Sequence, residues 1–310
     1  MCLSNQSTVT FFIIKGISDA PEQQVLIFHL VLLIYLTTLG GNMMILLLVY
    51  LDPQLHTPMY FFVANLSVLD ISYTSLTLHK ILISFISGDN TVSFLGCMTQ
   101  TYIFGSLIAD QLQILALMSY DRYMAICNPL RYHTIMNHRR CSLLATACWM
   151  LGFLEIMPHI VLLSRFSFSS NELNHFLCDI VPLLRLTCSD TTVFEQMVFF
   201  TILFHVLFSF LLICIPYIFI INTILKIRSS NGRHKAFYTC SAHLTVVTLL
   251  YITLICQYLK PNSGGSGESD KVFTLFNTAA VPALNPIIYS LKHKDIQSAL
   301  RRRLMLYQRK

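Results

Sequence analysis

Charged residues are scarce in this sequence. Only 12% of its 310 residues are Asp, Glu, Lys or Arg, whereas a soluble globular domain carries about a quarter. Hydrophobic residues make up 55%, so the composition indicates a membrane protein. The net charge of +6 does not indicate a nucleic-acid partner. The basic residues lie between apolar runs and in the tail, as expected beside an anionic cytoplasmic leaflet.

Other features are missing altogether. The ten cysteines form no CxxC pair, so their spacing does not predict a zinc or redox cluster. Met1 to Lys15 contain no apolar core followed by a small-residue cleavage site, so we expect the first apolar run to serve as the insertion signal. No nucleophile–base set or metal spacing recurs on one face, so we expect neither an enzyme nor a cofactor.

Seven long apolar segments are present, and each is long enough to cross the bilayer as a helix. They are Val25–Leu51, Pro58–His79, Phe94–Tyr120, Cys141–Ser164, Gln196–Leu225, Ala236–Leu259 and Val272–Leu291. Residues Lys292–Gln308 then alternate bases with apolar residues, which indicates an amphipathic helix on the inner leaflet; a frayed tail is the alternative. The predicted fold is an all-α seven-transmembrane helix bundle with a short C-terminal amphipathic helix.

The Lys and Arg residues predict the orientation of the bundle. With the N-terminus outside, most of the 21 bases fall in the inner loops and the tail, as the positive-inside rule requires. The Asn5-Gln6-Ser7 sequon agrees with an extracellular glycosylated N-terminus. We therefore expect an extracellular N-terminus over residues 1–24, a receptor domain over 25–291 and a cytoplasmic helix and tail over 292–310.

The end of the third segment, Met118–Tyr132, places an acid beside a base at the membrane edge. Charges there are costly unless they pair or reach water. Because adjacent residues on a helix do not face each other, Asp121 and Arg122 can take different partners and form a releasable clasp. The alternative is a simple interfacial charge pair.

The seventh segment contains Asn285-Pro286 and ends near Tyr289. Proline inside a helix removes a backbone hydrogen bond and kinks it, and a kinked helix can have two packings. A static kink is the alternative. Asp70 lies in mid-membrane, where an acid indicates a functional site.

Several segments together resemble the odorant receptors, a branch of the rhodopsin-like (class A) G-protein-coupled receptors, in that family's order and spacing. They are Leu55–Phe62, Leu66–Asp70, Met118–Tyr132, Lys235–Leu244 and Pro282–Leu291. The similarity covers nearly the whole chain and favours the tetrapod-type class. It implies a plasma-membrane receptor of olfactory cilia that binds an odorant and activates a stimulatory heterotrimeric G protein, which raises cyclic AMP.

Three other classes compete with this reading. A non-olfactory chemosensory receptor would share the same motifs. A seven-helix transporter would need several intramembrane charges at one midplane site, and the acids here are isolated. A retinal protein needs a lysine in the last span, and Val272–Leu291 has none.

The resemblance assigns roles to particular residues. The activation switch would comprise Asp121, Arg122, Tyr123, Tyr217, His243, Asn285, Pro286 and Tyr289, with Tyr217 meeting Arg122 in the active state. Cys97 and Cys178 would form a disulfide, and Asp70 is a candidate sodium ligand. Whether Cys188 has a partner stays open, with Cys2 as a candidate, because Phe168 stands where the family has the partner cysteine.

The chain also departs from the family in its spans. Gln111 replaces the usual Glu, and its neighbour Asp110 points about 100° away round the helix. That change puts sodium binding in question, and Asp110 can instead face the cavity or pair with His205. Pro216 precedes Tyr217 where the family has serine, and Ile252 replaces a glycine.

The resemblance and helical spacing predict a ligand cavity in the outer half of the third to sixth spans. Its candidate residues are Phe104, Gly105, Ile108, Ala109, Val198, Ile202, His205, Tyr251, Leu254, Ile255, Tyr258 and Thr278. They suit a small, mostly hydrophobic molecule with one hydrogen-bonding group. Any one aliphatic member could instead face lipid or another helix. Glu155 and His159 are one turn apart; they could orient a polar odorant or neutralise each other.

Overall fold

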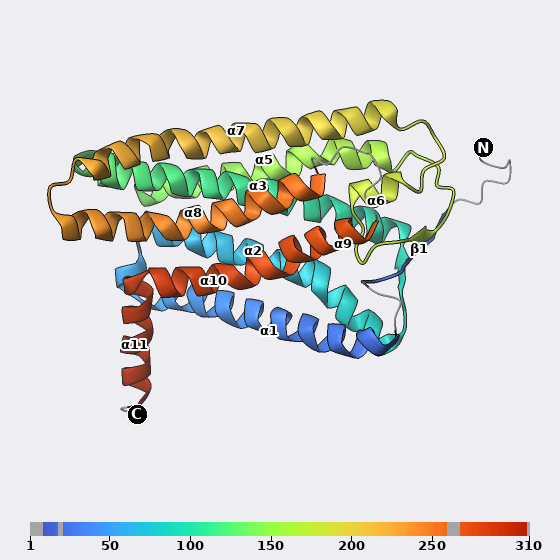
Figure 1. Ribbon diagram of the computed structural model, residues 1–310, viewed down its shortest axis with the longest axis horizontal. Helices are drawn as coiled ribbons and strands as arrows, with labels where there is room; N and C mark the ends of the chain where they lie inside the picture. Colours follow the sequence, from blue (N-terminus) through green and yellow to red (C-terminus); the bar gives the residue numbers. More distant parts are fainter. Residues whose placement is uncertain (1–8, 18–20, 259–266, 309–310) are drawn as a thin grey trace.

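A computed structural model describes residues 9–17, 21–258 and 267–308. Within them, seven helices are long and apolar enough to cross a membrane (Figure 1), which confirms the predicted fold class. Six are single helices: α1 (Pro21–Leu51), α2 (Pro58–Ser87), α3 (Phe94–Cys127), α5 (His138–Leu163), α7 (Thr192–Leu225) and α8 (Ser230–Tyr258). The seventh span joins α9 (Gly267–Leu275), a π-helical turn (Phe276–Ala280) and α10 (Val281–Lys292).

Several helices extend beyond the apolar segments that predict them, because only the part in the hydrocarbon must be apolar. Helix α2 continues past His79 to Ser87 and ends at Gly88, whose φ of 71° is a left-handed conformation that favours glycine. Helix α3 begins at Phe94, as predicted, where the Ser93 hydroxyl caps it by accepting from the Gly96 amide at 3.1 Å.

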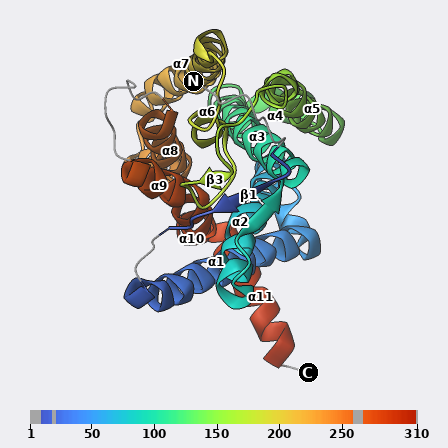
Figure 2. The ribbon, with the colours of Figure 1, turned by 90° about the vertical axis from the view of Figure 1, so that its right-hand side faces the viewer.

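Helix α3 is the centre of the bundle. It packs against α2, α5, α7 and α8, and 72% of its most apolar stretch is buried, compared with 22% for α1, α5 and α7. Viewed from the outer end, α3 lies among the other spans, while α1 and α5 lie at the periphery (Figure 2). Side chains on α3 can therefore contact most of the spans that would have to move in a receptor.

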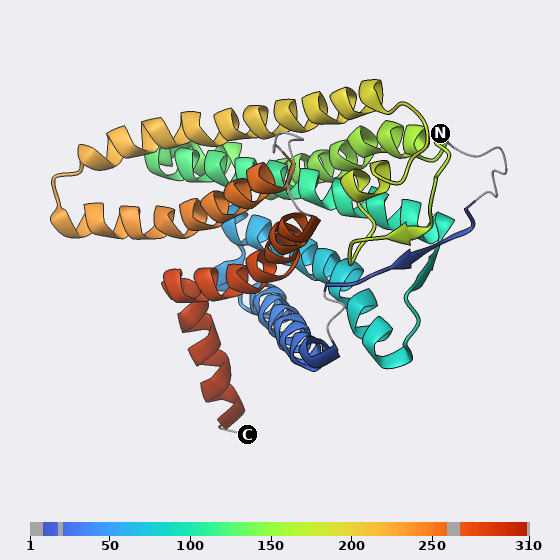
Figure 3. The ribbon, with the colours of Figure 1, turned by 45° about the vertical axis from the view of Figure 1, so that its right-hand side comes forward.

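A small sheet covers the outer end of the bundle. Strand β1 (Phe11–Ile14) lies between β2 (Thr91–Ser93), to which it is antiparallel, and β3 (Glu172–Leu173), to which it is parallel (Figure 3). Phe12 is fully buried, and its ring meets that of Phe168 edge-on at 5.3 Å. Phe168, which stands where the family has a cysteine, thus packs the N-terminal strand onto the long outer loop.

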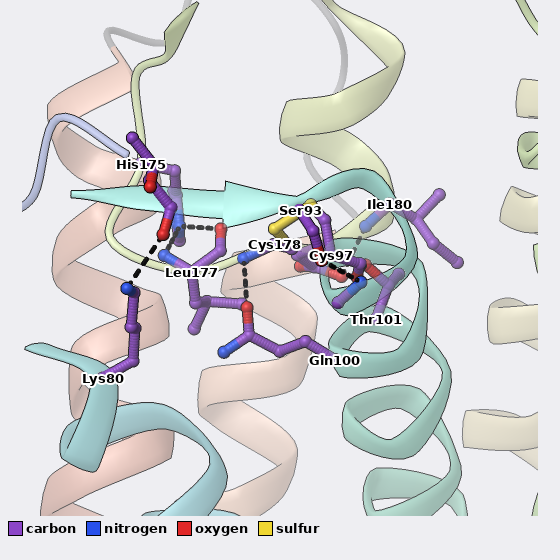
Figure 4. The surroundings of a disulfide bond; sticks show 12 residues. Lys80, Ser93, Cys97, Gln100, Thr101, His175, Leu177, Cys178 and Ile180 are labelled. Carbon is purple, nitrogen blue, oxygen red and sulfur yellow. Dashed lines mark hydrogen bonds between the residues drawn. A yellow bond between two sulfur atoms is a disulfide. The ribbon is translucent and has the colours of Figure 1, made fainter. Parts of the chain in front are cut away.

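The Cys97–Cys178 disulfide joins this loop to the start of α3, as the resemblance implies. Beside it, the Gln100 side-chain oxygen accepts from the Cys178 amide at 3.0 Å (Figure 4). Cys188 is also disulfide-bonded. Its candidate partner Cys2 and the sequon at Asn5 lie outside the described residues.

Three short helices complete the connections: the 3₁₀ turn Pro53–Leu55, α4 (Pro129–Ile135) and α6 (Ile180–Leu184). At the inner end, α11 (Lys294–Gln308) turns away from the bundle axis (Figure 1). It begins two residues later than predicted because His293 has extended backbone angles. Its Arg302 contacts Asp52 at 2.6 Å, and this hydrogen-bonded guanidinium holds the pKa of the Asp52 carboxyl below its ordinary value.

Candidate functional site

A cavity of about 80 Å³ lies in the outer half of the bundle. Helices α3, α5, α7 and α8 form its walls and the outer loop covers one side. Its lining is Gly105, Ile108, Ala109, Leu112, Glu155, Ile156, His159, Asp179, Ile180, Val198, Thr201, Ile202, His205, Val206, Leu254 and Tyr258. Most of these residues are apolar; Glu155, His159, Thr201 and His205 gather where α5 faces α7, and Asp179 and Tyr258 lie where the outer loop meets α8. This composition suits a small, largely hydrophobic ligand.

Eight of the twelve candidate ligand residues line this cavity: Gly105, Ile108, Ala109, Val198, Ile202, His205, Leu254 and Tyr258. The other four lie elsewhere. Phe104 stacks on Tyr73 at 5.0 Å, and Tyr251 donates to the Ser209 hydroxyl at 2.7 Å. Ile255 is exposed on the outside of α8, and Thr278 is buried in the π-helical turn. Helical spacing could not separate these faces, because it does not give the rotation of a helix about its axis.

The polar corner of the cavity is built around Glu155. Its carboxylate lies 2.9 Å from Nδ1 of His205 on α7. His159 Nδ1 instead contacts the backbone carbonyl of Glu155 at 3.2 Å, and its Nε2 contacts the Thr201 hydroxyl at 3.2 Å. The structure therefore does not pair the Glu155 and His159 side chains. One turn of helix brings the imidazole to the carbonyl, while the longer glutamate side chain reaches across to α7.

Asp110 faces neither the cavity nor His205. Its carboxyl group points at α5, where Gly152 leaves room for it: a Cβ at position 152 would collide with the Asp110 carboxylate. Both carboxyl oxygens are buried without a hydrogen-bond partner among the described residues. The Asp110 carboxyl group thus occupies the space beside α5 that the missing side chain of Gly152 leaves open.

The outer loop contributes Asp179 to the lip of the cavity. Its carboxyl group accepts from the Ile180 amide at 2.7 Å and from the Tyr258 hydroxyl at 3.1 Å. Burial raises the pKa of Asp179 to about 6, against the lowering effect of these hydrogen bonds. The loop carboxyl and α8 are therefore joined directly at the mouth of the cavity.

In mid-membrane, Asp70 joins three spans. Asn285 on α10 donates to both of its oxygens, at 3.1 and 2.9 Å, and Gln111 on α3 donates at 3.5 Å. These amides satisfy the carboxyl group with N–H donors. No group of three or more His, Cys, Asp or Glu that could hold a metal occurs in the described ranges. The candidate sodium site at Asp70 stays a prediction.

At the inner end, Asp121 has two partners. Its Oδ2 lies 3.5 Å from Arg122 Nη2, and its Oδ1 accepts from the Tyr132 hydroxyl at 2.8 Å. Burial raises the pKa of Tyr132 above its ordinary value, which keeps this hydroxyl a donor. The clasp therefore extends beyond the adjacent pair to the short helix α4.

Tyr217 does not contact Arg122 in this arrangement. Its hydroxyl lies 2.9 Å from Nδ1 of His243 on α8, whose Nε2 contacts the Leu115 carbonyl on α3 at 3.0 Å. The other switch residues lie nearby. The Tyr123 ring is 5.8 Å from that of Phe219, and Pro286 approaches Gly41 so closely that a Cβ there would lie 2.8 Å from its ring. Tyr289 is buried and stacks on His293 at 5.7 Å.

Sequence reasoning did not single out several of these residues. The sequence does contain a signal for Thr201 as a cavity residue, because it precedes His205 by one helical turn and so shares its face. Tyr132 lies inside the motif that predicts the clasp. The sequence contains no signal that Asp179 and Ile180 reach the cavity, because their position depends on how the outer loop folds back.

Seven spans, a mostly apolar outer cavity and a hydrogen-bonded inner end define a seven-helix membrane receptor. A family model described as olfactory receptor matches residues 31–308. Human olfactory receptor 5L1 is 44% identical over 299 residues, which cover 96% of each chain. Mouse olfactory receptor 5AP2 is 44% identical over 98% of this chain and 96% of its own. Human olfactory receptor 8B3 is 42% identical over 100% and 99%.

The chain therefore belongs to the olfactory receptor family of G-protein-coupled receptors, which are multi-pass plasma-membrane proteins and not enzymes. This confirms the family that the motifs indicate. The relatives span the same length, so the similarity includes both the cavity and the inner switch.

Proposed function

We propose that this protein is an odorant receptor that binds a small, mostly hydrophobic molecule and activates a stimulatory heterotrimeric G protein, raising cyclic AMP. Its N-terminus would be extracellular and its location the cilia of olfactory neurons. The proposal is carried by one observation: the same two helices, α7 and α8, line the outer cavity and hold the Tyr217–His243 contact at the inner end. His205 and Tyr217 are both on α7, and Leu254 and His243 are both on α8.

Mechanistically, an odorant shifts the receptor only if it binds the active arrangement more tightly than the resting one. A ligand held between α7 and α8 would change how these helices pack at the cavity. Because both are continuous helices, the change would reach the Tyr217–His243 contact at their inner ends. Its release would free Tyr217 to meet Arg122 and open a groove for a helix of the G protein.

The experiment is a cyclic AMP reporter in cells that express the receptor, screened against a chemically broad odorant panel. We expect at least one odorant to raise cyclic AMP, and Arg122→Ala to abolish that response. Surface staining of both proteins controls for trafficking. A response that persists at full size in Arg122→Ala would contradict the switch, and a silent receptor at normal surface density would contradict the coupling.

A further inference from the structure

The ligand cavity has an excess of acidic groups. Its lining includes the carboxyl groups of Glu155 and Asp179, and none of the described lining residues is Lys or Arg. Such a cavity attracts a cationic ligand and repels an anionic one.

His159 does not offset this charge. Its Nδ1 faces the Glu155 carbonyl, which can only accept, so Nδ1 carries a proton. Its Nε2 can then accept from the Thr201 hydroxyl. Both ring nitrogens are satisfied with a single proton, so the buried ring is uncharged in this arrangement.

His205 contacts the Glu155 carboxylate from α7. Its Nδ1 donates to the Glu155 carboxylate at 3.0 Å, while its Nε2 is buried and has no hydrogen-bond partner in the part of the chain that the structure describes. A second proton would bury an N–H group without an acceptor, which is costly. The Glu155 carboxylate thus receives one N–H group from His205, and its side chain stays 27% exposed.

We propose that the cavity binds a protonated aliphatic amine, with the Glu155 carboxylate as its counter-ion. An ammonium group supplies several N–H donors, so it can donate to the Glu155 carboxylate alongside the His205 N–H group. The apolar body of the amine would lie among Ile108, Ile202 and Leu254. Away from bulk water, an ion pair and its charge-assisted hydrogen bond are stronger than a neutral contact. The inference rests on the proposed function and adds the ligand class.

A series of ligands with one chain and different head groups tests this directly. Octylamine, 1-octanol and octanoic acid share their apolar body and differ in charge. In the cyclic AMP assay we expect octylamine to be at least tenfold more potent than 1-octanol, and octanoic acid to be inactive. An equal or higher potency for the alcohol or the acid would overturn the proposal.

Glu155→Gln keeps the size of the side chain and removes its charge. We expect the ratio of octylamine to 1-octanol potency to fall at least tenfold in this variant and to be retained in Glu155→Asp, which keeps the charge. Glu22→Gln, at the exposed start of α1, is the matched control and should leave the ratio unchanged. A ratio that survives Glu155→Gln would contradict Glu155 as the counter-ion.

A binding measurement separates this inference from the proposed function. Octylamine should raise the unfolding temperature of the purified receptor, and Glu155→Gln should abolish that increase. If octylamine stabilises neither protein, the amine site is wrong even when another odorant raises cyclic AMP. If it stabilises only the protein with Glu155 but no ligand raises cyclic AMP, the amine site holds and the coupling fails.

Discussion

The hydroxyl of Tyr217 and Nδ1 of His243 are 2.9 Å apart, and their rings are nearly parallel at 5.7 Å. Because the Leu115 carbonyl can only accept, His243 donates to it through Nε2 and accepts from Tyr217 through Nδ1. One imidazole thus links α3, α7 and α8 at a buried point of the bundle. In its neutral form the ring can do this as one tautomer only, with the proton on Nε2.

Removing this imidazole should loosen the bundle. His243→Ala leaves the Leu115 carbonyl and the Tyr217 hydroxyl without their partner, at a cost of about 1–3 kcal/mol for each buried polar group. We expect a lower unfolding temperature for the purified receptor. Tyr217→Phe keeps the ring stack and removes only the hydroxyl, so the double variant should lose less than the sum of the single ones. Strict additivity would show that the two side chains do not interact.

Gly152→Ala should disrupt the contact between α3 and α5. The new Cβ would meet the Asp110 carboxylate, and overpacking of this kind costs about 1–3 kcal/mol. Gly40→Ala on α1 is the control, because a Cβ there meets nothing within 4 Å. Thermal unfolding of both variants checks the prediction, and Asp110→Ala in the Gly152→Ala background should restore stability. Equal effects at positions 152 and 40 would contradict it.

The Asp52–Arg302 pair should hold α11 in place. We expect Arg302→Gln to increase hydrogen exchange in α11, because the helix loses its ion pair with the first inner loop. Arg301→Gln, an exposed neighbour on the same helix, is the matched control. The lowered pKa of Asp52 makes the pair stabilising above the ordinary pKa of 3.8, and this contribution is lost as the pH falls further. Identical exchange in both variants would refute the role of Arg302.

The stability contribution of Asp179 should depend on pH in the direction opposite to that of Asp52, because its pKa is raised and not lowered. Its pKa rises from 3.8 to about 6 on folding, so the native state holds the proton more tightly between these values. The free energy of unfolding should therefore fall by up to about 3 kcal/mol as the pH rises through that window. Asp179→Asn should remove this dependence. Unfolding temperatures at pH 5 and 7.5 test it, and an unchanged slope in the variant would exclude Asp179 as the cause.

Much of this structure could be predicted from the sequence because bilayer length and hydropathy strongly constrain it. The seven spans follow from apolar runs, and the start of α3 coincides with the predicted Phe94. The cavity was predicted only in part. Phe104 and Ile108 lie one turn apart, yet Phe104 packs on Tyr73 and only Ile108 reaches the cavity. That difference depends on helix rotation, which a single sequence does not specify.

The polar contacts were harder to predict because they depend on neighbouring helices. Glu155 has His159 one turn away, but its carboxylate contacts His205 on another helix. Asp110 points to α5 because position 152 is a glycine there. Pairing rules within one helix cannot anticipate either contact.

The order of the outer sheet has a consequence for biosynthesis. Strand β1 is made among the first residues, but it pairs with Glu172 of β3, which the ribosome adds far later. At 5–20 residues per second, roughly ten to thirty seconds separate the two strands. The N-terminal strand must therefore wait, unpaired on one edge, until four spans have been synthesised. Any partner that binds Phe11–Ile14 in this interval would compete with the pairing of β1 and β3.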